Sequence, residues 1–278
     1  MPPAIRLGPL VFPAELAVLA AASAAGLLAA HLLARRGRTG RHADVSGLLW
    51  GALITGLVAA RLGFVWQYRD TFAQNPLAIL DVRDGGWAGM FGLGAAWIYA
   101  VGGMLRRGAP RPAVLGGLAL ATATWLAGDR VLSHSEHAPA VLTELRLQDL
   151  DGAPLALSAF QGKPAVINLW ASWCPPCRRE MPAFAQAQAE HPDVNFVFLN
   201  QGESTPEITQ YLRQHAPGLQ NVLRDPASDA SRQLSNRGLP ATLFLDAGGR
   251  LVDLRVGELS AATLAQRLES LQRGPGQE

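Results

Sequence analysis

Long apolar runs without an alternating polar face fill most of the first 130 residues of the chain. The runs extend over Leu10–Ala34, Ser46–Trp66, Trp87–Leu105 and Ala113–Gly128. Each is close to the length that crosses ~30 Å of hydrocarbon, although the fourth is short. Their many small residues allow the close helix packing typical of membrane bundles. We therefore expect an α-helical membrane domain with four transmembrane helices over residues 1–130, in preference to a soluble bundle of buried helices.

The pattern changes after residue 140 to short strands that alternate with amphipathic helices. Alternation around Asp151-Gly152 predicts a hairpin, and the apolar runs 164–171 and 195–200 predict buried strands. Helices are predicted over 175–191 and 205–216, the second with Thr205 as N-cap. A second hairpin through Gly248-Gly249 and a closing helix over 260–273 complete an order of β-α-β-α-β-β-α. This order predicts an α/β domain over 141–278 with the thioredoxin-like arrangement.

The segment 131–140 is short and polar and ends in Ala-Pro-Ala, so it predicts a linker between the two domains. The first apolar run also has small residues like those of a cleavage site. However, Glu15 stands early in the run, the basic cluster follows it, and three more apolar runs come after. These features favour a retained membrane anchor over a cleaved signal peptide.

The charges in the loops predict the orientation of the chain. The first run is followed by Arg35, Arg36, Arg38 and Arg41, and the third by Arg106, Arg107 and Arg111. The loop between the second and third runs has mixed charge. Because positive loops remain in the cytoplasm, we expect the N-terminus and everything after residue 130 to lie outside. This predicts a multi-pass protein of a bacterial inner membrane with its C-terminal domain in the periplasm.

The amino-acid composition excludes several classes of function. The net charge of +2 comes without a dense basic patch, so no nucleic-acid partner is expected. Only two cysteines are present, which excludes a disulfide-rich scaffold. Both stand in "LWASWCPPCRREMP", residues 169–182, between a predicted strand and a predicted helix.

This placement favours redox chemistry. Cys174 falls at the helix N-terminus, ahead of Pro175 and Pro176, where a missing N–H costs nothing. The helix dipole stabilises a thiolate there, which predicts Cys174 as nucleophile. Cys177 stands one turn later and can resolve a mixed disulfide. Structural zinc needs four ligands and no second cysteine pair exists, while a staple across two residues adds little stability, so we expect neither a metal site nor a structural disulfide.

The C-terminal half resembles the TlpA/ResA-like membrane-tethered thiol–disulfide oxidoreductases over about residues 141–273. The motifs are "DLDGAPLALSAFQGKPAVINLWASWCPPCRREMP" and "GLPATLFLDAGGRL". The resemblance implies that Pro240 is a cis-proline facing the active site, beside which a substrate's extended chain could pair. It implies that Trp173 shields the cysteines, with simple core packing as the alternative. It also implies that Glu180 assists proton transfer, with a surface charge as the alternative. Asn168 stands where cytoplasmic thioredoxin has a buried aspartate.

The N-terminal half resembles the first part of the bacterial prolipoprotein diacylglyceryl transferases over about residues 5–105. The motifs are "IRLGPLVFPAE", "ARLGFVWQYRDTFAQNPLAIL" and "DVRDGGWAGMFGLG". Met90 stands where that family has a histidine, and the later Gly-Arg-x-Gly-Asn-Phe signature is missing. We therefore expect a truncated scaffold without acyl transfer. The resemblance leaves four residues as candidate lipid-headgroup contacts: Arg61, Asp84, Gly85 and Gly86. Snorkelling to the membrane surface is the alternative for Arg61.

Together these patterns predict a membrane-anchored periplasmic disulfide reductase, serving cytochrome c maturation or the repair of oxidised thiols. A disulfide-forming oxidase or isomerase is one alternative. A lipid-binding membrane protein whose redox domain is secondary is the other. The expected partners are a separate membrane dithiol protein as electron donor, disulfide-containing periplasmic proteins as substrates, and membrane lipid. No cofactor is expected.

Overall fold

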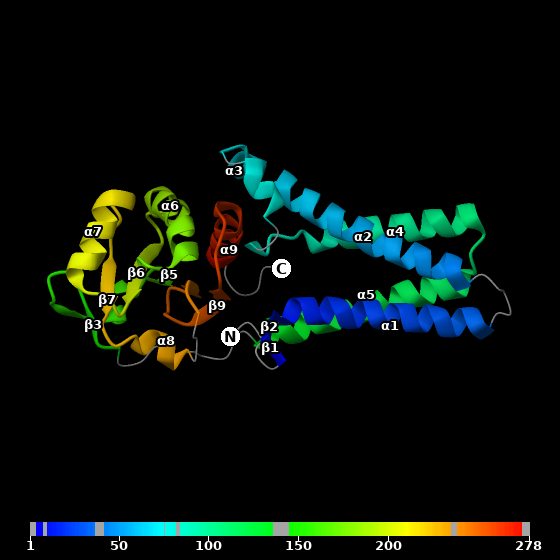
Figure 1. Ribbon diagram of the computed structural model, residues 1–278, viewed down its shortest axis with the longest axis horizontal. Coiled ribbons are helices and arrows are strands. Elements are labelled where there is room, and N and C mark those ends of the chain that lie inside the picture. Colours follow the sequence, from blue (N-terminus) through cyan, green and yellow to red (C-terminus); the bar gives the residue numbers. More distant parts are fainter. Residues whose placement is uncertain are drawn as a thin grey trace. The chain divides into compact units, whose positions relative to one another are not determined.

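The computed structural model describes residues 4–7, 10–36, 42–74, 76–81, 84–135, 145–234 and 238–273. The chain forms two compact units (Figure 1). One contains Pro3–Ile79 and Gly86–His134, and the other contains Ser135–Glu278 together with Leu80–Gly85.

The N-terminal unit is built from four long helices. They are α1 (Ala14–Arg36), α2 (His42–Gln67), α4 (Gly89–Arg107) and α5 (Arg111–Ser135). A short helix α3 (Arg69–Gln74) and the 3₁₀ turn η1 (Pro76–Leu80) lie between α2 and α4. The predicted bounds need two corrections. The first run begins as the strand β2 (Leu10–Pro13), paired with β1 (Ala4–Leu7), because a residue before proline avoids helical geometry. Helix α5 also continues into the predicted linker, since no proline or glycine interrupts 129–135.

Two of the described helices are long and apolar enough to cross a membrane, over Leu16–Arg35 in α1 and Val45–Gln67 in α2. Both coincide with predicted apolar runs. The third and fourth runs form α4 and α5, which are helical as predicted. That these two helices also cross the membrane stays a prediction.

Small residues bring the helices of this unit together in pairs (Figure 1). A Cβ atom at Gly92 of α4 would lie 2.7 Å from the carbonyl oxygen of Gly56 on α2. A Cβ atom at Gly117 of α5 would lie 2.7 Å from the carbonyl oxygen of Gly26 on α1. The backbones therefore approach so closely that only glycine fits, as in membrane helix pairs with small residues at the interface.

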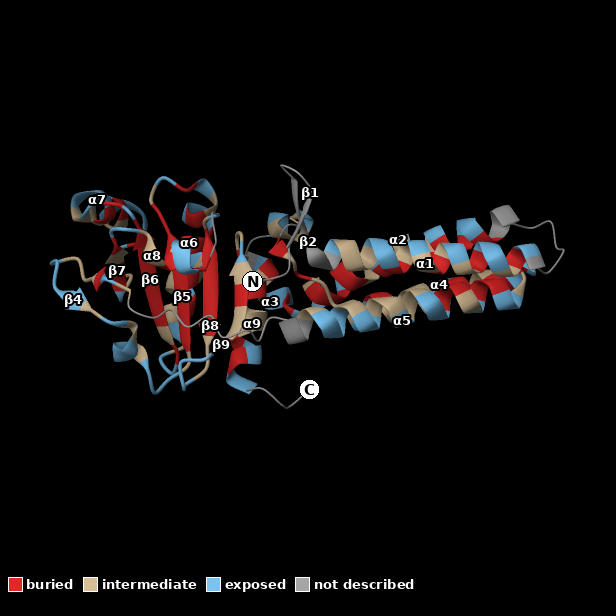
Figure 2. Ribbon diagram, turned by 90° about the horizontal axis from the view of Figure 1, so that it is seen from below, coloured by how far each residue is buried: buried red, intermediate tan, exposed pale blue. Residues whose placement is uncertain are grey.

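The C-terminal unit contains a sheet of seven strands in the order β4-β3-β7-β6-β5-β8-β9. Its strands are β3 (Leu147–Gln148), β4 (Pro154–Leu155), β5 (Ala165–Trp170), β6 (Asn195–Gln201), β7 (Val222–Asp225), β8 (Ala241–Leu245) and β9 (Leu251–Val256). The central strands β5, β6 and β8 are the most buried (Figure 2). Strands β5, β6 and β7 are parallel, and β8 and β9 are joined antiparallel through Gly249, whose φ of 79° suits glycine.

Helices cover both faces of this sheet. The face that carries Val166 and Trp170 packs against α6 (Pro175–Glu190), α7 (Thr205–His215) and α9 (Ala261–Arg273). The opposite face carries Ile167 and Leu169 and packs against α8 (Asp229–Gln233) and the 3₁₀ turn η3 (Leu157–Phe160). Because strand side chains alternate, Asn168 lies on the α6 face.

Two local predictions in this unit were wrong. The predicted order lacked β7 and α8, because a four-residue strand with a half-buried arginine at its third position gives no clear alternation. The N-cap of α7 is Ser204 rather than Thr205. Ser204 forms a capping box with Glu207, whose Oε2 accepts bonds from the Ser204 backbone N–H at 2.8 Å and hydroxyl at 2.7 Å.

Candidate active site

The two cysteines lie where β5 gives way to α6. Cys174 is the N-cap of α6, and Pro175 and Pro176 occupy the first helical positions, so the backbone geometry matches the prediction. Cys174 and Cys177 form a disulfide with an S–S distance of 2.07 Å. The backbone N–H of Cys177 donates to Cys174 Sγ at 3.3 Å. The Cys177 N–H, at the N-terminus of α6, therefore already points at the sulfur that would carry the negative charge if Cys174 were a thiolate.

The environment of the disulfide is asymmetric. Both cysteines are buried, with Cys177 fully enclosed in the core that surrounds α6. The preceding side chain, Trp173, is 67% exposed. Trp173 is therefore at the surface, so core packing does not explain it. Its role in shielding the cysteines stays a prediction.

The strand β8 contributes Pro240 just before its first residue. The peptide bond between Leu239 and Pro240 is cis, in agreement with the implied cis-proline. Leu239 packs against the buried cluster that contains both cysteines. The carbonyl of Pro240 accepts the N–H of Gly257 at 2.8 Å. This carbonyl is already engaged, so pairing with a substrate chain would use the backbone on the Leu239 side.

Glu180 lies one helical turn beyond Cys177 on α6 and is only 1% exposed. Its Oε1 accepts a bond from Asn168 Nδ2 at 2.8 Å, and its Oε2 accepts one from the backbone N–H of Leu259 at 2.9 Å. Burial raises the pKa of Glu180 to about 8, although both hydrogen bonds act in the opposite direction. The surface-charge interpretation is therefore wrong. Near neutral pH this carboxyl group can both hold and release a proton.

Another buried acidic residue, Glu203, was not predicted as part of the site. Its Oε2 accepts bonds from the Ser172 backbone N–H at 2.7 Å and from Asn200 Nδ2 at 2.6 Å. The Ser172 hydroxyl donates to Oε1 at 2.5 Å. Glu203 thereby ties the segment just before Trp173 and Cys174 to the end of β6. Its position directly after a buried strand, at the same end of the parallel strands as Cys174, was the available signal.

In the N-terminal unit, Arg61 is buried and binds three backbone carbonyls. Its Nη1 donates to Gly86 O at 2.9 Å, its Nη2 to Ala78 O at 3.0 Å and its Nε to Ile79 O at 3.1 Å. The guanidinium also lies near two aromatic rings, Phe64 at 5.8 Å and Phe72 at 5.5 Å. These contacts hold the segment between α2 and α4 and account for the buried charge without snorkelling.

The other predicted lipid contacts are divided between the two units. Gly86 belongs with Arg61, whereas Asp84 and Gly85 belong to the segment that groups with the C-terminal unit. Gly85 has a φ of 77°, which favours glycine at a turn. Lipid contact by any of these residues stays a prediction.

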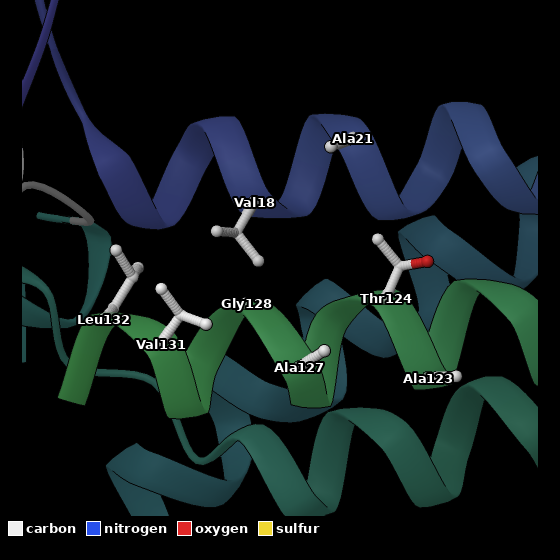
Figure 3. A pocket seen from close by; sticks show the side chains of 8 residues that line it. All are labelled: Val18, Ala21, Ala123, Thr124, Ala127, Gly128, Val131 and Leu132. Carbon is white, nitrogen blue, oxygen red and sulfur yellow. The ribbon is translucent and has the colours of Figure 1, made fainter. Parts of the chain in front are cut away.

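An open apolar groove runs between α1 and α5 (Figure 3). The lining residues are Val18, Ala21, Ala123, Thr124, Ala127, Gly128, Val131 and Leu132. Thr124 is the polar residue of this lining, and the groove contains no titratable side chain. Its composition suits hydrocarbon and offers no catalytic group.

Comparison with known families identifies the C-terminal half. The Redoxin family model matches residues 127–268, just over half of the chain. The chain belongs to the Redoxin family. A second family model, prolipoprotein diacylglyceryl transferase, matches residues 6–127. This match reaches about one helix further than the resemblance over residues 5–105 predicted.

Several individual proteins are similar in sequence to the C-terminal half. The chain is 30% identical over 110 residues to the thiol:disulfide interchange protein DsbE of Allochromatium vinosum, covering 40% of this chain and 60% of that protein. It is 26% identical over 155 residues to the thiol-disulfide oxidoreductase ResA of Bacillus subtilis, covering 53% of this chain and 81% of ResA. A secreted Mycobacterium tuberculosis disulfide oxidoreductase homologous to E. coli DsbE is 28% identical in sequence. The alignment with its crystal structure covers 45% of this chain and 93% of that chain, with a TM-score of 0.40.

The redoxin domain thus gathers several of the predicted site residues around one disulfide. Cys174, Cys177 and Glu180 come from α6, and Trp173 from the segment that precedes it. Asn168 on β5 bonds to Glu180, and Glu203 after β6 bonds to Ser172 just before Trp173. The C-terminal half resembles thiol–disulfide oxidoreductases of the DsbE and ResA type in sequence.

Proposed function

We propose that this chain is a membrane-anchored thiol–disulfide oxidoreductase that reduces disulfides in proteins on the outer side of a bacterial inner membrane. The main observation in support of this proposal is the Cys174–Cys177 disulfide at the N-terminus of α6. An anion is stabilised there by the helix dipole and by the Cys177 N–H, which favours Cys174 as the attacking thiolate. The similarity to DsbE and ResA supports this assignment.

The reaction is a two-electron exchange. In the reduced protein, the Cys174 thiolate attacks one sulfur of a substrate disulfide, which forms a mixed disulfide and releases one substrate thiolate. The Cys177 thiol then loses its proton, with Glu180 as the acceptor, and attacks Cys174 Sγ. The Cys174–Cys177 disulfide forms and the second substrate thiolate leaves. The substrate gains two electrons and the domain is left oxidised. Solvent protonates the two substrate thiolates, and Glu180 returns the Cys177 proton to solvent.

The return to the reduced state requires another protein. Cys174 and Cys177 are the two cysteines of the chain, so the helical unit cannot relay electrons by dithiol exchange. A membrane dithiol protein is the proposed electron donor. The four-helix unit serves as anchor and docking module, with α4 and α5 proposed as spans alongside α1 and α2. The apolar groove between α1 and α5 supports lipid as its surroundings.

Two measurements test this proposal, one on the full-length protein in nanodiscs and one in cells. The first is the equilibrium potential of the Cys174–Cys177 pair against glutathione. A value below about −200 mV is expected for a reductase, whereas a value near −120 mV, that of a strong oxidant, would overturn this direction and favour the oxidase or isomerase.

The second measurement is capture of substrates by Cys177→Ala, which cannot resolve mixed disulfides through Cys174. In a reducing-donor background this variant should accumulate disulfide-linked periplasmic proteins, apocytochrome c among them. The matched control carries Cys174→Ala as well and should capture none. Equal capture by both variants would contradict the proposed nucleophile. Full complementation of a deletion strain by Cys174→Ser would favour the lipid-binding alternative.

A further inference from the structure

The buried amide of Asn168 is arranged in an unusual way within the redoxin domain. Its Nδ2 donates to Glu180 Oε1 at 2.8 Å and to Thr242 Oγ1 at 3.1 Å. Its Oδ1 is buried and has no hydrogen-bond partner within the described part of the chain. A buried acceptor without a partner costs free energy, so the orientation must be maintained by the two bonds that Nδ2 makes.

The bonds around Glu180 fit one protonation state better than the other. Both carboxyl oxygens accept an N–H, one from Asn168 and one from the backbone of Leu259. These bonds strengthen when the carboxyl group is ionised, and neither N–H group can accept a bond from a carboxyl O–H. This is the geometry of an ionised carboxylate, although burial favours the neutral acid.

Thr242 sets the orientation of the amide. Asn168 on β5 and Thr242 on β8 are direct cross-strand neighbours, and both are buried. The second N–H of Nδ2 bonds to the Thr242 hydroxyl. With the amide reversed, this hydroxyl could donate to Oδ1 instead, but Oδ1 would also face Glu180 and would repel its ionised carboxylate. Asn168 therefore links Glu180 to the strand that follows Pro240.

We propose that Asn168 is a positioning residue for disulfide exchange, which favours the ionised form of Glu180 against the effect of burial and orients its carboxyl group as the acceptor of the Cys177 proton. The inference rests on the proposed function and assigns a role to a residue whose side chain bonds to Glu180 and Thr242 rather than to the cysteines. Glu180 and Cys177 are three residues apart on α6, so they are neighbours on one face of the helix. An amide at position 168 can favour ionisation without bringing a second titrating group into the core.

The test is a titration of Glu180 in the full-length protein in nanodiscs, labelled with side-chain ¹³C glutamate. The Glu180 signal is identified by its absence in Glu180→Gln. In the wild type its midpoint should lie near the pKa of about 8 that burial sets. In Asn168→Ala the midpoint should rise by about one pH unit, the size expected for the loss of one charge-assisted hydrogen bond.

The chain offers a matched control in Asn200→Ala. Asn200 is also a buried asparagine on a central strand, but its Nδ2 donates to Glu203 instead of Glu180. This variant should leave the Glu180 midpoint unchanged. An unchanged midpoint in Asn168→Ala would overturn the proposal. If Asn168→Ala does not fold, Thr242→Val decides, because it keeps the side-chain shape and removes the second bond of Nδ2. A partial rise supports the proposal, and no rise overturns it.

A parallel pH profile separates this inference from the proposed function. The rate at which the reduced protein attacks a small disulfide probe should show an inflection that moves with the Glu180 midpoint in Asn168→Ala. If disulfide exchange by the wild-type protein does not depend on Cys174, the proposed function is contradicted. The titration of Glu180 would still test the effect of Asn168. Normal exchange with an inflection that Asn168→Ala does not move would contradict the role of Asn168 alone.

Discussion

At the residue scale, the site combines a surface-exposed approach with a buried proton-handling group. Trp173 is exposed directly before Cys174, whereas Glu180 and Cys177 are both enclosed on the inner face of α6. Glu203 adds a fixed carboxylate that holds the segment around Ser172. A large substrate can therefore contact Trp173 next to the buried nucleophile, while the proposed acceptor of the Cys177 proton is kept from bulk water.

Burial of Glu180 has a consequence for stability that can be measured. Its pKa rises from 4.5 in the unfolded chain to about 8 in the native state. Between these values the native state binds more protons than the unfolded state, so the free energy of unfolding falls as the pH rises through this window. The loss from this one group can reach about 5 kcal/mol, and the full contribution is present below pH 4.5.

Glu180→Gln removes this titration. The apparent melting temperature of the redoxin domain should fall with rising pH between 5 and 8 in the wild type and remain nearly flat in the variant. Differential scanning fluorimetry of the full-length protein in detergent checks this. Glu190→Gln, at the exposed end of the same helix, is the control and should keep the wild-type slope. A slope in Glu180→Gln equal to that of the wild type would contradict the assignment.

At the scale of elements, the N-terminal unit depends on close contacts between helix backbones. Gly92 of α4 faces Gly56 and Ala60 of α2, and a Cβ atom at Gly92 would lie 2.8 Å from the Cβ of Ala60. Gly94 of the same helix has nothing within 4 Å of such a Cβ atom. The two glycines therefore lie in the same helix, but one is in close contact with α2 and the other is not.

Gly92→Ala should destabilise the helical unit by about 1–3 kcal/mol, because the helices must move apart to admit a methyl group. Gly94→Ala should be neutral or slightly stabilising, since alanine restricts the unfolded chain without a clash. Thermal unfolding of both variants in the same detergent, followed by the resistance of α2 and α4 to proteolysis, measures the difference. Equal stability of the two variants would show that α2 and α4 do not pack at Gly92.

Much of this element arrangement could be predicted from the sequence, and the exceptions have physical causes. The CPPC segment was placed correctly because proline marks the first turn of a helix and the preceding strand is uniformly apolar. Strand β7 was missed because its four residues take their strand geometry from pairing with β6 and β3, a long-range effect. The hydrogen bonds of Asn168 to Thr242 and of Ser172 to Glu203 were not predicted for the same reason, since each joins segments that are distant in the sequence.

At the scale of the whole molecule, a redoxin domain and a helical unit without cysteine are joined in one chain. The exchange chemistry depends on which side of the membrane the disulfide faces. The basic loops before α2 and after α4 predict that these loops are cytoplasmic and that the redoxin domain is outside. This orientation requires that all four long helices cross the membrane.

Single cysteines in a Cys174→Ser and Cys177→Ser background can test this arrangement. Thr39→Cys and Pro110→Cys lie in the two basic stretches of the sequence. Ala73→Cys lies between α2 and α4, and Ser158→Cys lies in the redoxin domain. In intact cells with a permeable outer membrane, an impermeant maleimide should label the last two positions and leave the first two unlabelled. All four should be labelled after lysis, which serves as the control for accessibility.

Labelling of Pro110→Cys in intact cells would show that α4 and α5 do not both cross, because this loop reaches the cytoplasm in the four-span arrangement alone. Protection of Ser158→Cys would place the disulfide in the cytoplasm, where the glutathione pool could reduce it and a dedicated membrane donor would be unnecessary.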